Sequence, residues 1–169
     1  MTGSPPLATA IARLARRLAA LVYETLIAAA ILLVAGFALT PLMSPVADPG
    51  GALTLPGPAR RIAGFALLAA ILGAYFIVCW SGGRRTLPMK TWRMRLVDAR
   101  GAPVTPPRAL ARYVAGWIGP AAAIALYAMT HSRLAALALA LPYAWALVDP
   151  DRRFLHDRLA GTRLVGEAA

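Results

Sequence analysis

The longest apolar run of this chain, residues 18–40, contains a single charged side chain, Glu24. As a helix this run would reach roughly 34 Å, which is enough to cross the hydrocarbon core of a bilayer. Three further apolar runs follow at about residues 62–80, 113–130 and 134–148. The sequence therefore predicts an all-α membrane protein: a four-span transmembrane helical bundle with short cytoplasmic strand and helix elements.

The third and fourth runs leave two interpretations open. The third contains Gly116, Gly119 and Pro120, and the fourth is short for a full crossing. Either both cross the membrane, joined by the polar turn at residues 130–133, or one of them is re-entrant. Four spans place fifteen of the eighteen Lys and Arg residues on one side. The positive-inside rule makes that side the cytoplasm, so we predict two separate spans and cytoplasmic termini.

Composition narrows the class of partner. Hydrophobic residues make up 59% of the chain, and the net charge is +11. The basic residues cluster at the ends of apolar runs, which favours anionic lipid headgroups at the cytoplasmic face over nucleic acid. Cys79 is the only cysteine, which excludes an internal disulfide. Because no nucleophile motif, phosphate-binding loop or Cys/His cluster occurs, we expect no enzyme activity, no cofactor and no metal site.

Between the spans, local patterns predict shorter elements. Residues 12–166 form one domain after a flexible N-terminal tail, residues 1–11, and Pro41 ends the first span. Proline and glycine make residues 41–59 a loop. Alternating apolar and basic side chains over residues 92–96 predict a short strand, and a turn follows at residues 98–101.

Helix signals stand on either side of the third and fourth runs. Thr105 is an N-cap candidate for a helix that begins with Pro106 in its first turn. In the polar tail, Asp149-Pro150-Asp151 predicts a helix start, and Gly161 predicts its end.

Arg17 and Glu24 are seven residues apart and share one helix face, about 10 Å apart along the axis. A charged side chain inside a span is costly and is therefore paired or functional. Glu24 is either a carboxylate that binds a proton or cation, or a structural partner of Arg112 or Arg158. We favour the structural interpretation, in which the Arg17–Glu24 face receives the cytoplasmic segments.

The tail carries His156, Asp157 and Arg158 near Asp149 and Asp151. A proton relay or metal site would use such groups, but the spacing of metal ligands is missing. We predict instead that Asp157 pairs with Arg93, Arg95 or Arg17. This pair would tie the tail to the middle segment, with residues 162–165 beside the strand at 92–96.

Three motifs carry a family resemblance. The first span begins with RRLAALVYE at residues 16–24, the middle segment reads GRRTLPMKTWRMRLVDARG at 83–101, and the tail contains HDRLAGT at 156–162. Over roughly residues 12–166 the chain resembles the RDD family of bacterial integral membrane proteins. It departs from the family pattern at Glu24, where the family usually has Asp, and at Pro88, where it often has Gly.

The resemblance implies a multi-pass protein of the bacterial inner membrane, and its functional implications are broad. We expect a small accessory or scaffold protein that acts as a homo-oligomer or with a membrane partner protein. The alternative is a cation/proton antiporter that uses Glu24, since some family members have been linked to such exchange. The motif residues available for ion binding or structural pairing are Arg17, Glu24, Asp98, Arg112, His156, Asp157, Arg158, Gly161 and Thr162.

Overall fold

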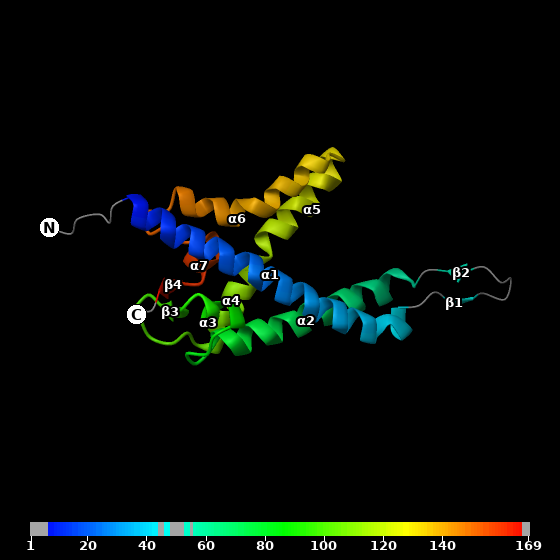
Figure 1. The fold of residues 1–169 in the computed structure, drawn as a ribbon. Coiled ribbons are helices and arrows are strands. Elements are labelled where there is room, and N and C mark those ends of the chain that lie inside the picture. The colour runs from blue at the N-terminus through cyan, green and yellow to red at the C-terminus, as the bar shows by residue number, and fades with distance from the viewer. Residues whose placement is uncertain (1–6, 44–45, 48–52, 55, 167–169) are drawn as a thin grey trace.

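The computed structural model describes residues 7–43, 46–47, 53–54 and 56–166. Most of these residues are helical, and two short antiparallel strand pairs accompany the helices (Figure 1). The α-helices are α1 (Leu7–Met43), α2 (Pro58–Trp80), α3 (Leu87–Thr91), α4 (Pro106–Gly116), α5 (Ile118–Thr130), α6 (Leu141–Ala144) and α7 (Leu155–Leu159). Two 3₁₀ helices, η1 (Arg133–Ala140) and η2 (Trp145–Leu147), flank α6, and the strands are β1 (Val46–Ala47), β2 (Leu53–Thr54), β3 (Met94–Asp98) and β4 (Thr162–Gly166).

Three helical segments are long and apolar enough to cross a membrane: Ala15–Leu42 of α1, Pro58–Trp80, and Pro106–Thr130, which joins α4 and α5. Large apolar side chains such as Phe37, Leu33 and Met129 stand exposed on these segments. Such surfaces are suited to lipid. The mostly helical, membrane-type fold is thus confirmed. The fourth span is not, because Arg133–Leu147 forms only a shorter apolar helix.

The first helix is longer at both ends than the sequence predicts. It begins at Leu7, inside the predicted tail, and continues to Met43 with Pro41 in its last turn. Proline removes one N–H donor but leaves the neighbouring amides able to bond, so a helix can end just beyond it. The helix after Thr105 begins at Pro106 as predicted. The remainder of the predicted loop at 41–59 contains the β1–β2 pair.

The third apolar run breaks where glycine and proline predict it. The helix is interrupted at Trp117, whose N–H donates to the Val114 carbonyl at 3.0 Å, three residues back. Beyond the break, α5 packs along η1, and a Cβ on Gly119 would lie 3.1 Å from Pro142. This close approach uses the missing side chain of Gly119. In Figure 1 the α5–η1 hairpin diverges from the α1–α2 hairpin.

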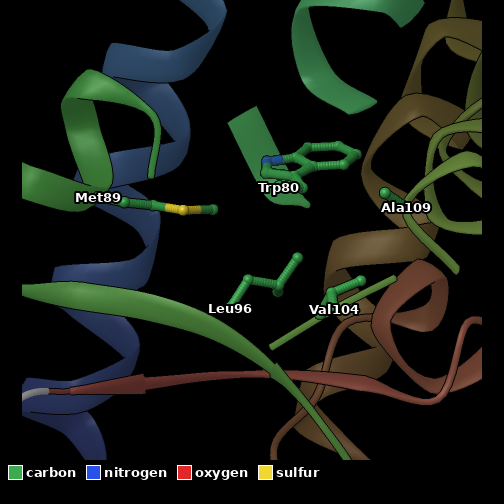
Figure 2. Close-up of a cluster of buried hydrophobic side chains, with 5 residues drawn as sticks. All are labelled: Trp80, Met89, Leu96, Val104 and Ala109. Carbon is green, nitrogen blue, oxygen red and sulfur yellow. The ribbon is translucent and has the colours of Figure 1, made fainter. Parts of the chain in front are cut away.

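One end of the molecule consists of α3, β3, β4 and α7, and we call it the polar end. The main apolar core also lies at this end. Here β3 and β4 pair antiparallel, with Leu96 opposite Leu164, which confirms the predicted pairing of the tail with the middle segment. The buried core cluster is shown in Figure 2 and consists of Trp80, Met89, Leu96, Val104 and Ala109. The core therefore joins α2 and α4 to the elements of the polar end.

The turn after β3 is confirmed, and the start of the tail helix is corrected. Asp98 Oδ1 accepts hydrogen bonds from the N–H groups of Arg100 (2.8 Å) and Ala102 (2.9 Å). The tail helix begins at Leu155 and not at Asp149. Asp149 instead closes a turn, because its Oδ2 accepts from the N–H of Arg153 at 3.0 Å. Gly161, with φ +64°, ends the helix as predicted.

The crossing of α2 and α4 depends on Gly73. The Tyr113 hydroxyl donates to the Ala69 carbonyl at 2.6 Å, and a Cβ on Gly73 would lie 2.9 Å from Tyr113 Cε1. We expect Gly73→Ala to destabilise the fold by about 1–3 kcal/mol through overpacking, measured by thermal unfolding in detergent. Gly36→Ala is the control, since nothing lies within 4 Å of its Cβ position. Equal midpoints for the two variants would contradict the close contact.

Candidate functional site

A cavity of about 380 Å³ lies among α1, α2, α4 and the polar end. It forms because α1 packs on α2 and α3, whereas α4 packs on α2 and α7. Its charged lining consists of Arg17, Glu24 and Arg112, with His156 beside them. Aromatic rings make up much of the remaining wall, namely Phe76, Trp80, Tyr113, Trp117, Tyr143 and Phe154.

Glu24 lies on the α1 wall of this cavity. Arg112 and Asp157 are its charged neighbours, and the side chains of Thr86 and Trp80 lie beside its carboxyl group. Among the described residues, the side-chain atoms buried without a hydrogen-bond partner are Glu24 Oε1, Trp80 Nε1 and Arg153 Nε. The ion pairs within the described ranges do not include Glu24. The predicted partner Arg112 is therefore near Glu24, but it forms its ion pair with Asp157.

Arg112 forms a buried ion pair with Asp157. Its Nε donates to Asp157 Oδ1 at 2.7 Å, and the two side chains are 6% and 1% exposed. The guanidinium carbon lies 4.1 Å from the centre of the Trp80 ring, in cation–π geometry. Burial alone would raise the pKa of Asp157, but the charge of Arg112 and its hydrogen bond hold this pKa below its usual value.

The predicted partners Arg93 and Arg95 of Asp157 are wrong. Strand alternation buries Met94 and Leu96, and it leaves Arg95 exposed on the opposite face of β3. Arg93 is also exposed. Arg112 reaches Asp157 because α4 packs directly on α7.

His156 completes this cluster as a neutral ring. Its Nε2 lies 3.3 Å from Arg112 Nη2, and because arginine only donates, Nε2 must accept. The rings of Tyr143 and Phe154 cover it, with centroid distances of 5.8 and 5.6 Å. Burial and the charge of Arg112 lower the pKa of His156 to about 4. The ring therefore positions Arg112 and does not carry charge at neutral pH.

Arg17 fastens the first helix to the tail. It donates to the carbonyl oxygens of Arg152 at 2.8 Å and Leu164 at 2.7 Å. Arg17 was also a predicted partner of Asp157, and its charge does act on this carboxylate. Its hydrogen bonds, however, go to the two carbonyls and hold the tail. The expected contact between the Arg17–Glu24 face and the tail is thus made by Arg17, while Glu24 lines the cavity.

A second buried carboxylate, Asp149, holds the loop before α7. Its Oδ1 accepts from Arg158 Nη1, so Arg158 is the partner of Asp149 and not of Glu24. Burial would raise the pKa of Asp149, but the Arg153 amide and Arg158 keep this pKa below its usual value. The sequence assigned Asp149 only a helix start. The arginines at 153 and 158 were the signal for its ion-pairing role.

The remaining motif residues lie away from the cavity. Asp98 pairs with Arg108 at 2.8 Å, and Gly161 ends α7. Thr162 stands opposite Asp98 in the strand pair, and its hydroxyl lies 3.4 Å from Asp157 Oδ1, behind the cavity wall. In the part of the chain that the structure describes, no group of three or more His, Cys, Asp or Glu side chains could hold a metal ion.

Sequence reasoning missed the aromatic wall, which includes Trp80 and Trp117. The available signal was spacing. Phe76 and Trp80 are four residues apart on α2, and Tyr113 and Trp117 are four apart across the α4 end. Such pairs share one face of a helix.

The structure has apolar helices long enough to span a membrane, and at one end of these helices it has a buried ion pair and a charged cavity. These features define a helical membrane protein. Within that class, the RDD family model matches residues 11–161, so this chain belongs to the RDD family. The family resemblance of the three motifs is thereby confirmed. No curated protein and no solved structure matches the chain.

Proposed function

We propose that the protein exchanges a cation for protons across the bacterial inner membrane and that Glu24 is the binding carboxylate. One observation carries the proposal: a carboxylate oxygen is buried without a hydrogen-bond partner, on the wall of a cavity of about 380 Å³. The other buried carboxylates of the cluster, Asp157 and Asp149, are held by arginines. Glu24 is thus the acid placed to exchange its counter-charge.

Exchange requires access from both faces, and we propose four crossings with both termini in the cytoplasm. The segment Arg133–Leu147 contains eight and three residues of 3₁₀ helix and four of α-helix. A 3₁₀ helix rises about 2.0 Å per residue, so the segment would extend about 28 Å, close to the hydrocarbon thickness. The excess of fifteen basic residues over three on the two sides supports this orientation.

A second candidate is the accessory or scaffold protein expected from the sequence. The strand register places Arg95 opposite Val165 and Arg163 opposite Val97, so both arginines lie on one face of the strand pair, where they are exposed. Such a face would contact anionic headgroups or an acidic partner protein. The accessory protein could also act as a homo-oligomer with a second copy of the chain. This candidate involves no enzyme reaction, cofactor or nucleic acid.

Flux in proteoliposomes tests the proposal. With a pH dye inside, an imposed Na⁺ or K⁺ gradient is expected to drive a pH change in the wild type. Glu24→Gln is expected to reduce this change to the level of empty vesicles, because the amide cannot exchange a proton. Asp151→Asn is the matched control, since this acid is 68% exposed and outside the cavity. No flux driven by Na⁺ or K⁺ in the wild type would reject exchange of these ions and favour the accessory function.

A further inference from the structure

The cavity wall differs from a site built for a small inorganic cation. Hard cations bind several oxygen ligands. Glu24 is the carboxylate among the described residues that line the cavity. Six aromatic side chains share that lining, and aromatic faces attract cations.

The rings form a connected wall that faces α1. Phe76 stacks on Trp80 with centroids 4.6 Å apart, and Tyr113 and Trp117 meet edge to face at 6.1 Å. Phe76 and Tyr113, at 6.2 Å, join the two pairs across α2 and α4. The Arg112 guanidinium already lies against Trp80. This wall therefore offers aromatic faces to a cation with delocalised charge.

Charge balance indicates the sign of an occupant. Arg112 is neutralised by Asp157 at 2.7 Å. Arg17 keeps its positive charge, but two backbone carbonyls of the polar end hold its guanidinium, and it lies two helical turns from Glu24 along α1. Glu24 contributes a carboxylate oxygen without a hydrogen-bond partner on the same wall. A cation beside Glu24 would compensate its charge, whereas an anion would be repelled by it.

The size and polarity of the cavity indicate the body of that cation. A volume of about 380 Å³ falls within the range of small-molecule sites, roughly 300–1,000 Å³. Besides its charged and aromatic side chains, the wall contains apolar residues such as Ala28, Leu72 and Pro120. A strongly hydrated ion would exchange its water for a single carboxylate there, while an apolar cation with spread charge gives up little hydration.

We propose that this cavity binds a monovalent organic cation with an aromatic or otherwise apolar body, its charge beside Glu24 and its body against Phe76, Tyr113 and Trp117. The inference deepens the proposed function, because it rests on Glu24 as the cation-binding group and names the class of cation. Binding itself requires no transport.

Equilibrium dialysis of the purified protein in detergent tests the inference with tetraphenylphosphonium. Tetraphenylborate is the matched probe, since it has the same shape and the opposite charge. We expect saturable binding of the phosphonium at one site per chain and none of the borate. Glu24→Gln is expected to weaken phosphonium binding at least about tenfold, while Asp151→Asn leaves it unchanged.

A second variant keeps the test independent of the folding of Glu24→Gln. Trp117→Leu retains apolar volume but removes a ring face, so phosphonium binding is expected to weaken roughly fivefold. Equal binding of both probes, or unchanged affinity in the two cavity variants, overturns the inference. Flux of Na⁺ or K⁺ without phosphonium binding leaves exchange standing and rejects the organic cation. Phosphonium binding without flux of Na⁺ or K⁺ supports the organic cation site and rejects exchange of these two ions.

Discussion

Replacing Arg112 with leucine is expected to lower the free energy of unfolding by about 3–5 kcal/mol, the largest single effect we predict for this protein. Arg112 and Asp157 are 6% and 1% exposed, with Nε and Oδ1 2.7 Å apart. Leucine keeps part of the apolar contact with Trp80, but it leaves the Asp157 carboxylate buried without its ion partner. The measurement is the unfolding midpoint of the purified protein in detergent, together with its monodisperse yield.

Two comparisons separate the ion pair from the lost volume. The double variant Arg112→Leu with Asp157→Asn removes both charges, so it is expected to regain most of the lost stability. Arg108→Leu breaks the pair with Asp98, in which the arginine is 46% exposed, and should cost no more than about 1 kcal/mol. A double variant no more stable than Arg112→Leu alone would reject the buried-charge explanation.

The partner of Asp157 shows where sequence reasoning stops. The HDRLAGT motif and the alternation at residues 92–96 were sufficient to predict that the tail pairs with the middle segment, and Leu96 does face Leu164. These are local patterns with a period of two. The choice of Arg112 over Arg93 or Arg95 depends on how α4 packs on α7, and Arg112 and Asp157 are 45 residues apart. Residues 81–112 contain eight basic residues, so charge alone did not distinguish Arg112 from the other seven.

The environment of Glu24 could be predicted only in part. Its depth along the first span follows from the helical rise, and its face follows from the seven-residue spacing to Arg17. The cavity beside it does not, because that space forms where α1 and α4 pack on different neighbours. The 3₁₀ geometry of Arg133–Ala140 was also hidden, since its alanine and leucine residues are ordinary α-helix formers.

Acidification from pH 7.5 to 4.5 is expected to destabilise the wild type by about 2–3 kcal/mol through His156. Burial and the charge of Arg112 hold the pKa of His156 at about 4, whereas an unfolded histidine titrates near 6.5. Between these values the unfolded chain binds more protons, so stability is full above about pH 6.5 and is lost as the pH falls toward 4. Each unit of difference between the folded and unfolded pKa corresponds to about 1.4 kcal/mol of stability, which gives the expected loss.

The pH window itself identifies the group. The lowered pKa values of Asp157, Asp149 and Asp98 contribute stability above the ordinary carboxyl value and lose it only at lower pH, as each folded pKa is crossed. His156→Gln is therefore expected to reduce the change of the unfolding midpoint between pH 7.5 and 4.5, whatever its effect on stability at neutral pH. His131→Gln is the matched control, because His131 is exposed on the α5–η1 turn and should leave the slope as in the wild type. If the slope persists in His156→Gln, another group carries the acid sensitivity, and the neutral, buried assignment of His156 is wrong.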